Sequence, residues 1–319
     1  MSIKTPHMNK TRYICVDPDQ AGRRIDNFLI SQLKGVPKTR IYQMLRRGEV
    51  RINQGRIKQD YRVRAGDSVR LPPSYVLDSV KTGKPPLSVQ KLLLDSILYE
   101  DEYMMILNKP AGMAVHGGSK QNFGLIEALR ETKDKRGDLE LVHRLDKATS
   151  GCLIISKNHI TLRKLNRMLQ QGEIRKNYLA LLHGSVNKKE LDVKLPLGKN
   201  ESKLYMGKIK IDYEGKKAHT KFSLLENFGF ASLVEIYLLT GRTHQIRVHA
   251  AHINHPVAGD DRYGRRDFNK TMKRFGLSRL FLHAGSLSFN HPVSNKKVSV
   301  NAPLPEDLSE CLIYCKKGL

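Results

Sequence analysis

The chain has 319 residues, of which 39% are hydrophobic and 27% charged, and its four cysteines follow no CxxC spacing; this length suffices for about two domains with buried cores and argues against a disulfide-stapled miniprotein. No apolar run approaches the roughly 18 residues that cross a bilayer, and no apolar signal segment opens the sequence, so we expect a cytoplasmic protein without a membrane partner. The 56 lysines and arginines against 31 acidic residues leave a net charge of +25, which favours nucleic acid over a membrane surface as the partner, because the sequence has no tryptophan and no long basic amphipathic helix.

The first predicted elements lie between residues 20 and 75, where lysine and arginine far outnumber acidic residues. Two sets of apolar residues recur at helical spacing and predict two short helices: Ile25, Phe28, Leu29 and Leu33, then Ile41, Met44 and Leu45. Gly48 stands where the end of a helix favours glycine. From Val50 to Leu71 the apolar period changes to two, which predicts a small antiparallel sheet.

This order of two helices and a small sheet resembles an S4-type RNA-binding domain, most clearly over KTRIYQMLRRGEVRINQGRIK, residues 38–58. The second helix carries four candidates for contacts with RNA phosphates: Lys38, Arg40, Arg46 and Arg47. Their spacing places several of them on one exposed face. The alternative is a basic helix face that contacts only solvent.

A proline-rich stretch separates this region from the rest of the chain. Residues 72–91 contain four prolines and no sustained period, which predicts an interdomain linker. We therefore expect an S4-like domain over residues 20–75, a linker over 76–95 and a second domain over 96–319.

The second domain is expected to mix strands and helices. Five stretches have the pattern of strands: 104–107, 151–156, 178–183, 232–239 and 280–289. Four stretches between them have the pattern of helices: 123–130, 161–171, 244–253 and 306–314. The predicted fold class is therefore α+β, with a small αα-β domain followed by a mixed α/β domain.

The segment LVHRLDKATSG, residues 141–151, runs from polar residues directly into an apolar strand. Asp146 stands at the entrance of that strand, and the positive charges of His143 and Arg144 nearby could hold its carboxylate ionised, as a nucleophile requires. The alternative is that Asp146 only orders the turn before Thr149. The local sequence leaves both interpretations open.

A second polar segment, TGRTHQIRVHAAHINHP, residues 240–256, concentrates histidines and arginines. His249 and His252 share a helix face, but no acidic residue that could complete a metal site lies in the segment. We therefore expect no metal. Arg242, in a turn after a predicted strand, has the fork-shaped guanidinium that suits a carboxylate or a phosphate.

Six segments resemble, in order, the motif series of the ribosomal large-subunit pseudouridine synthases of the RluA family: NKPAGMAVH, VHRLDKATSG, RKNYLALLHG, LLTGRTHQIRVH, HPVAGDDRYG and RLFLHAGSLSF. The match covers about residues 96–305. It implies a pseudouridine synthase domain built on a largely antiparallel sheet. It also implies large-subunit ribosomal RNA as the substrate and partner, and we expect the chain to act as a monomer.

The resemblance also implies roles for individual residues. Asp146 matches the catalytic aspartate, Arg242 the arginine that pairs with it, and Tyr178 the tyrosine that stacks on the target base. Leu282 matches an apolar residue under the site, and Arg144 an arginine that fills the gap left by the flipped nucleotide; His143 is expected to contact the substrate beside it. Tyr178 and Leu282 lie on predicted strands, where such residues are also ordinary core residues.

The implied reaction breaks the bond between C1′ and N1 of uridine and rebuilds it through C5, with no change of oxidation state, so no cofactor is required. The aspartate can attack C1′, attack C6 or take the 2′ proton, and the sequence does not choose among the three. One alternative function is a non-catalytic S4-domain RNA-binding or ribosome-assembly factor. Another is a metal-dependent nuclease, for which Asp260 and Asp261 beside His255 form the only acidic and histidine cluster.

Overall fold

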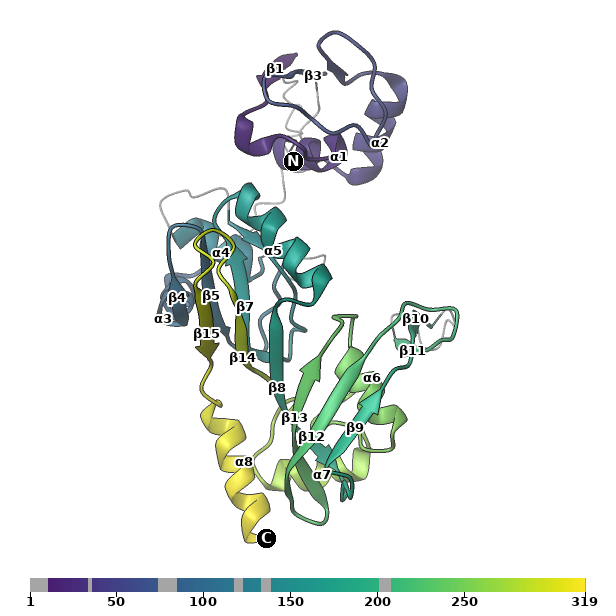
Figure 1. Cartoon of the computed structure of the whole chain (residues 1–319), viewed down its shortest axis with the longest axis vertical. Helices are drawn as coiled ribbons and strands as arrows, with labels where there is room; N and C mark the ends of the chain where they lie inside the picture. Colours follow the sequence, from purple (N-terminus) through teal and green to yellow (C-terminus); the bar gives the residue numbers. More distant parts are fainter. Residues whose placement is uncertain are drawn as a thin grey trace, which may run out of the picture. The chain divides into compact units, whose positions relative to one another are not determined.

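A computed structural model describes residues 11–33, 36–73, 85–117, 123–132, 139–200 and 208–318. These residues form two compact units that divide between residues 84 and 85, and Figure 1 labels their elements. No helix among the described residues is long and apolar enough to cross a membrane.

The first unit is the small αα-β structure that the sequence predicts. Its elements are β1 (Arg12–Cys15), a short 3-10 helix (Pro18–Gln20), α1 (Ile25–Gln32), α2 (Lys38–Arg47), β2 (Arg51–Ile52) and β3 (Ser68–Leu71). The strands pair antiparallel in the order β1-β3-β2. The sheet therefore begins before residue 20, where we expected the domain to start. Helix α2 ends at Gly48 in the left-handed conformation, as its glycine predicts.

The second unit is built on one large sheet. Its strands are β4 (Ile97–Glu100), β5 (Met104–Lys109), β6 (Glu140–Leu141), β7 (Ser150–Ser156), β8 (Arg175–His183), β9 (Glu190–Val193), β12 (Thr220–Asn227), β13 (Ala231–Leu238), β14 (Leu282–Asn290) and β15 (Lys297–Asn301). The main path runs β4-β5-β7-β14-β8-β13-β12-β9, with β15 beside β14 and β6 beside β7. Every pair is antiparallel except β7 with β14, so the predicted α+β class and largely antiparallel sheet are confirmed.

Six helices and a separate hairpin complete the described part of this unit. The helices are α3 (Leu87–Asp95), α4 (Leu125–Thr132), α5 (His159–Gln171), α6 (Gln245–His252), α7 (Arg266–Arg274) and α8 (Glu306–Lys317). The hairpin pairs β10 (Leu197–Lys199) with β11 (Ile209–Ile211). In the view of Figure 1, α6 lies behind β12.

Helix α3 corrects the predicted linker of residues 76–95. Two prolines, Pro85 and Pro86, precede the helix, and Leu93 on it is fully buried in the core of the second unit. Proline suits the start of a helix as well as a linker, and here it marks the start. Residues 74–84 of the predicted linker lie outside the described residues.

A buried lysine anchors the loop that carries Asp146. Lys109, at the end of β5, donates from Nζ to the carbonyls of Pro110 (2.7 Å), Met113 (2.9 Å) and Lys147 (3.3 Å). Burial lowers the pKa of Lys109 to about 7, opposed by the charge of Asp146. The backbone N–H of Gly112 also donates to the Lys147 carbonyl, at 2.8 Å. These bonds hold the residue after Asp146 against the sheet.

Gly151, on β7, is required where β7 approaches β14. Its φ is +109°, and a Cβ there would lie 2.3 Å from the carbonyl oxygen of Ala284. We expect Gly151→Ala to lower the free energy of unfolding by about 3 kcal/mol or more, since left-handed strain and a backbone clash add. Chemical denaturation measures this change.

Gly172→Ala is the matched control. Gly172, at the end of α5, has φ +77°, and a methyl group added there would meet no atom within 4 Å. Only the backbone strain therefore applies, and we expect a loss of about 1 kcal/mol. Equal losses in the two variants would show that the approach of β7 to β14 is not the constraint.

Candidate active site

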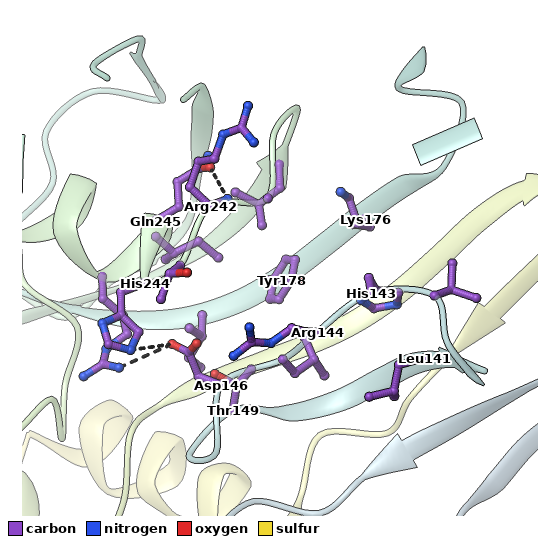
Figure 2. Close-up of a pocket in the computed structure, with 18 of the residues that line it drawn as sticks. Leu141, His143, Arg144, Asp146, Thr149, Lys176, Tyr178, Arg242, His244 and Gln245 are labelled. Carbon is purple, nitrogen blue, oxygen red and sulfur yellow. Dashed lines mark hydrogen bonds and ion pairs between the residues drawn. The ribbon is translucent and has the colours of Figure 1, made fainter. Parts of the chain in front are cut away.

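The second unit contains a cavity of about 510 Å³ at the entrance of β7. Its lining includes residues 141–146 and Thr149 of one loop, Lys176 and Tyr178 of β8, residues 241–247 around the start of α6, and Leu282 of β14. Figure 2 shows Asp146, Tyr178 and His244 around it. The central strands thus bring together four segments that are far apart in the sequence.

Asp146 is ion-paired on one of its two oxygens. Arg247 Nη1 donates to Oδ2 at 3.3 Å, and His244 Nε2 lies 3.8 Å from the same oxygen. The two dashed lines that meet at Asp146 in Figure 2 mark these interactions. The Asp146 side chain is 26% exposed, and no donor among the described residues contacts Oδ1. Oδ1 is therefore the oxygen that a bound substrate can reach.

Arg247 is held in place by a second carboxylate. Its Nε and Nη2 donate to Oδ2 and Oδ1 of the buried Asp260 at 2.7 and 2.8 Å. Although burial alone would raise it, the hydrogen bonds and charge of Arg247 keep the pKa of Asp260 below its usual range. The guanidinium carbon also lies 5.1 Å from the centre of the Tyr263 ring. Arg247 is thus a rigid bridge between Asp260 and Asp146.

The predicted ion pair between Asp146 and Arg242 is wrong. Arg242 lies in the exposed turn before α6, where its Nε donates to the Lys217 carbonyl at 3.1 Å and its backbone N–H donates to Gln245 Oε1 at 3.0 Å. Arg247 is five residues further on, in α6, and its side chain is the one that reaches the carboxylate. Arg242 still lines the cavity.

Tyr178 and Leu282 form apolar walls of the cavity. Tyr178 lies on β8 opposite Ile236, and Leu282 lies on β14 opposite Ala180. The two side chains are 6% and 4% exposed. Burial, with smaller contributions from Asp146 and Cys152, raises the pKa of Tyr178, so its phenol is neutral at physiological pH. A neutral ring beside a carboxylate suits a stacked base.

His143 and Arg144 precede Asp146 in the same loop and both line the cavity, but they have different roles. His143 Nε2 accepts a hydrogen bond from the Ile154 backbone N–H at 3.1 Å. Burial, and then the charge of Lys176, lower the pKa of His143 to about 3. The imidazole is therefore neutral, so the expectation that its charge keeps Asp146 ionised is wrong. Arg144 is exposed at the cavity, where RNA can reach it.

Lys176 is a cavity residue that the sequence analysis missed. It is two residues before Tyr178 on β8, so both side chains point to the same face. Burial lowers its pKa, and its amine has no hydrogen-bond or ion-pair partner among the described residues. The alternation along the strand could have identified it once Tyr178 was placed. A half-buried amine without a partner suits a phosphate of the substrate.

In the first unit, the four predicted RNA-contact residues lie on α2 outside the set of its buried residues. Lys38, Arg46 and Arg47 are exposed, and Arg40 is half-buried. Arg40 pairs with Glu49 at 2.9 Å, and Arg47 reaches the same carboxylate at 3.9 Å. Lys38 and Arg46 are thus the most open to phosphate.

Two histidines of residues 240–256, His249 and His255, take part in separate structural interactions. His249 is buried between Thr220 Oγ1 and the Leu195 carbonyl, both at 2.9 Å. His255 Nδ1 lies 2.8 Å from the His183 carbonyl oxygen. Within the described ranges, no group of three or more His, Cys, Asp or Glu residues is arranged to hold a metal ion. Asp260, which we considered for a nuclease site, instead binds Arg247.

Comparison with known proteins agrees with both units. A family model described as RNA pseudouridylate synthase matches residues 103–252, and an S4 domain model matches residues 23–69. The ribosomal large subunit pseudouridine synthase C of Yersinia pestis is 46% identical over 306 residues, covering 96% of each chain. The protein of the same name from Escherichia coli (strain K12) is 45% identical over 315 residues, covering 98% of each chain.

Two solved human structures share the fold of the second unit. The RNA pseudouridylate synthase domain containing 1 protein is 28% identical with a TM-score of 0.57, and covers 71% of this chain and 90% of its own. The second is human RNA Pseudouridylate Synthase Domain Containing 4, with a TM-score of 0.60 over 72% of this chain and 96% of its own. Because it is only 23% identical, this likeness shows the fold alone.

The sheet, the cavity around Asp146 and the separate S4 unit together define an RNA-modifying isomerase of the pseudouridine synthase class. The relatives match almost the whole chain at well above 30% identity. The chain belongs to the RNA pseudouridylate synthase family.

Proposed function

We propose that this protein isomerises specific uridines of large-subunit ribosomal RNA to pseudouridine, with Asp146 as the catalytic carboxylate and without a cofactor. The observation that carries the proposal is the arrangement of Asp146. Its Oδ2 is held by Arg247 and faces His244, while its Oδ1 is open to a cavity walled by Tyr178. The relatives from Yersinia pestis and Escherichia coli are named as ribosomal large subunit pseudouridine synthases, which supports large-subunit ribosomal RNA as the substrate.

The target nucleotide must leave its stack to reach this cavity, because Asp146 and Tyr178 lie in a pocket of the protein. Asp146 Oδ1 then attacks C1′, attacks C6 or takes the 2′ proton, and the bond from C1′ to N1 breaks. The uracil turns against Tyr178 and Leu282, and C5 bonds to C1′ as the bond to Asp146 breaks or the 2′ proton is returned. The C5 proton is then lost to a base, and N1 takes up a proton in its place. No external group or electron is consumed in this sequence.

The cations at the mouth of the cavity bind the RNA around the flipped nucleotide. Arg144 and Arg242 are exposed there, and Lys176 lies deeper with no partner among the described residues. We assign Arg242 to phosphate contact rather than to catalysis. His143 anchors the loop that carries Asp146 by accepting a hydrogen bond from the Ile154 backbone N–H. Its ring also lines the cavity, where it can contact the substrate.

Conversion of free RNA by the purified protein tests the proposal. Large-subunit RNA transcribed with tritium at C5 of uridine should release tritium into water, because C5 exchanges its hydrogen for the new carbon bond. Chemical mapping should then find pseudouridine at a few defined positions. A protein that binds this RNA but releases no tritium would support the alternative, a non-catalytic assembly factor.

We also propose that the enzyme acts as a cytoplasmic monomer without membrane contact.

The S4 unit is expected to contribute affinity rather than chemistry. A protein beginning at Pro85, which keeps α3 and the whole cavity, should still isomerise uridine at saturating RNA. Its RNA binding should be weaker and less dependent on salt, since each lost phosphate contact removes about 0.7 to 0.9 from the slope of log affinity against log salt concentration. Filter binding over a salt series measures this slope.

The matched control for this truncation is the full chain with Lys38 and Arg46 changed to Gln. It should reproduce part of the reduced slope without a change in turnover. A folded truncated protein that binds RNA with the full slope but does not turn over would show that the division of roles between the two units is wrong.

A further inference from the structure

His244 occupies an unusual position for a histidine. It directly precedes α6 and has φ +54°, in the left-handed region that non-glycine residues seldom adopt. Its ring has two polar neighbours: Nδ1 lies 2.9 Å from the Tyr263 hydroxyl, and Nε2 lies 3.8 Å from Asp146 Oδ2. The backbone strain is thus found at a residue that faces the catalytic carboxylate.

The hydroxyl of Tyr263 links the ring of His244 to the backbone of β11. The backbone N–H of Ile209, on β11, donates to this hydroxyl at 2.9 Å. The hydroxyl therefore accepts from Ile209, and its own proton is free to be donated to His244 Nδ1. In the opposite tautomer, a lone pair on Nε2 would face the carboxylate oxygen, which is unfavourable. The network therefore favours a proton on Nε2, directed at Asp146.

The surroundings of His244 keep the ring neutral. Burial lowers its pKa, Asp146 raises it, Arg247 and Arg262 lower it, and Asp260 raises it, with a net lowering. A neutral ring can still donate one hydrogen bond. Unlike an imidazolium, it does not cancel the negative charge that Asp146 needs as a nucleophile or base.

We propose that His244 is a positioning residue that donates from Nε2 to Asp146 Oδ2 during the reaction, with its tautomer set by Tyr263. The present separation of 3.8 Å is longer than a hydrogen bond, and such contacts tighten when the substrate is bound. Together with Arg247, His244 fixes Oδ2 and leaves Oδ1 for the nucleotide. This inference rests on the proposed function, in which Asp146 is the catalytic carboxylate.

Two substitutions of His244 distinguish the role of Nδ1 from that of Nε2. In His244→Asn the amide occupies the place of Nδ1 and can still bond Tyr263, but nothing replaces Nε2; asparagine also tolerates the left-handed conformation. In His244→Gln the amide nitrogen comes near the place of Nε2. We expect His244→Asn to lower the single-turnover rate at saturating RNA about tenfold to a hundredfold, with unchanged RNA affinity. We expect His244→Gln to keep most of the wild-type rate.

A spectroscopic measurement on the full-length protein tests the tautomer without any activity. In protein labelled with ¹⁵N-histidine, the signals missing from His244→Asn identify His244. We expect a protonated Nε2 and an unprotonated Nδ1 at neutral pH, and a shift toward a mixture of tautomers in Tyr263→Phe, which keeps the ring over Arg247 and removes the hydroxyl.

A proton on Nδ1 alone, an imidazolium at neutral pH, or equal rates for the Asn and Gln variants would overturn the proposal. Failure of the proposed function has a different signature, since wild-type protein would then show no turnover while the spectrum still reported a proton on Nε2.

Discussion

Replacing Asp146 by Asn is expected to abolish pseudouridine formation, with a loss of at least about 10⁴-fold in single-turnover rate. The amide has the size of the carboxylate and can turn its oxygen toward Arg247, so the fold and RNA affinity should change little. It cannot act as an anionic nucleophile or base through the position of Oδ1. Tritium release from C5-labelled RNA, measured with a binding assay on the same RNA, separates the two effects.

Asp261→Asn is the matched control for Asp146→Asn. Asp261 is an exposed carboxylate of the same unit, next to the buried Asp260. The Asp261→Asn protein should form pseudouridine at the wild-type rate. An Asp146→Asn protein within tenfold of wild type would remove Asp146 from the chemistry.

Replacing Arg247 by Lys should be nearly as damaging, although the charge is kept. An ammonium group can contact Asp260 or Asp146, but it cannot form the two-point contact with Asp260 and also reach Asp146 Oδ2. We expect a loss of about 10² to 10³-fold in single-turnover rate. We also expect a loss of about 2 to 4 kcal/mol in the free energy of unfolding, because the buried Asp260 keeps an incomplete partner.

Arg242→Lys provides the comparison. The side chain of Arg242 is exposed, and its guanidinium donates to the Lys217 carbonyl rather than to a carboxylate. Lys should therefore keep activity within about threefold and stability within about 0.5 kcal/mol. If the two variants lost activity to the same extent, the assignment of Arg247 rather than Arg242 as the partner of Asp146 would fail.

Much of the fold could be predicted because local patterns and tertiary structure agree. The helices of residues 25–32 and 38–47 follow their apolar spacing, and strand β7 follows its apolar run. Helix α3 was missed because its prolines suit both a linker and the start of a helix, and only the burial of Leu93 distinguishes the two. Strands β9 and β12 have partly exposed burial patterns and can be recognised as strands only from their pairing in the sheet.

The site was predicted less completely. Asp146 and Tyr178 each stand in a contiguous motif, and the structure brings them to one cavity. Two arginines follow in the next motif, Arg242 and Arg247, and which of them reaches Asp146 depends on where α6 begins, a boundary that the sequence leaves uncertain by a few residues. The role of His244 depends on Tyr263 and Ile209, which come from distant segments.

The most direct test of the central claim, that Asp146 isomerises uridine in large-subunit ribosomal RNA, is to map pseudouridine in that RNA from cells that lack the gene. The same cells should be mapped with the wild-type gene restored and with the Asp146→Asn gene restored. We expect a defined set of pseudouridines to disappear without the gene, to return with the wild-type copy, and to stay absent with the Asn copy at equal protein level. An unchanged map without the gene, or restoration by the Asn copy, would contradict the account.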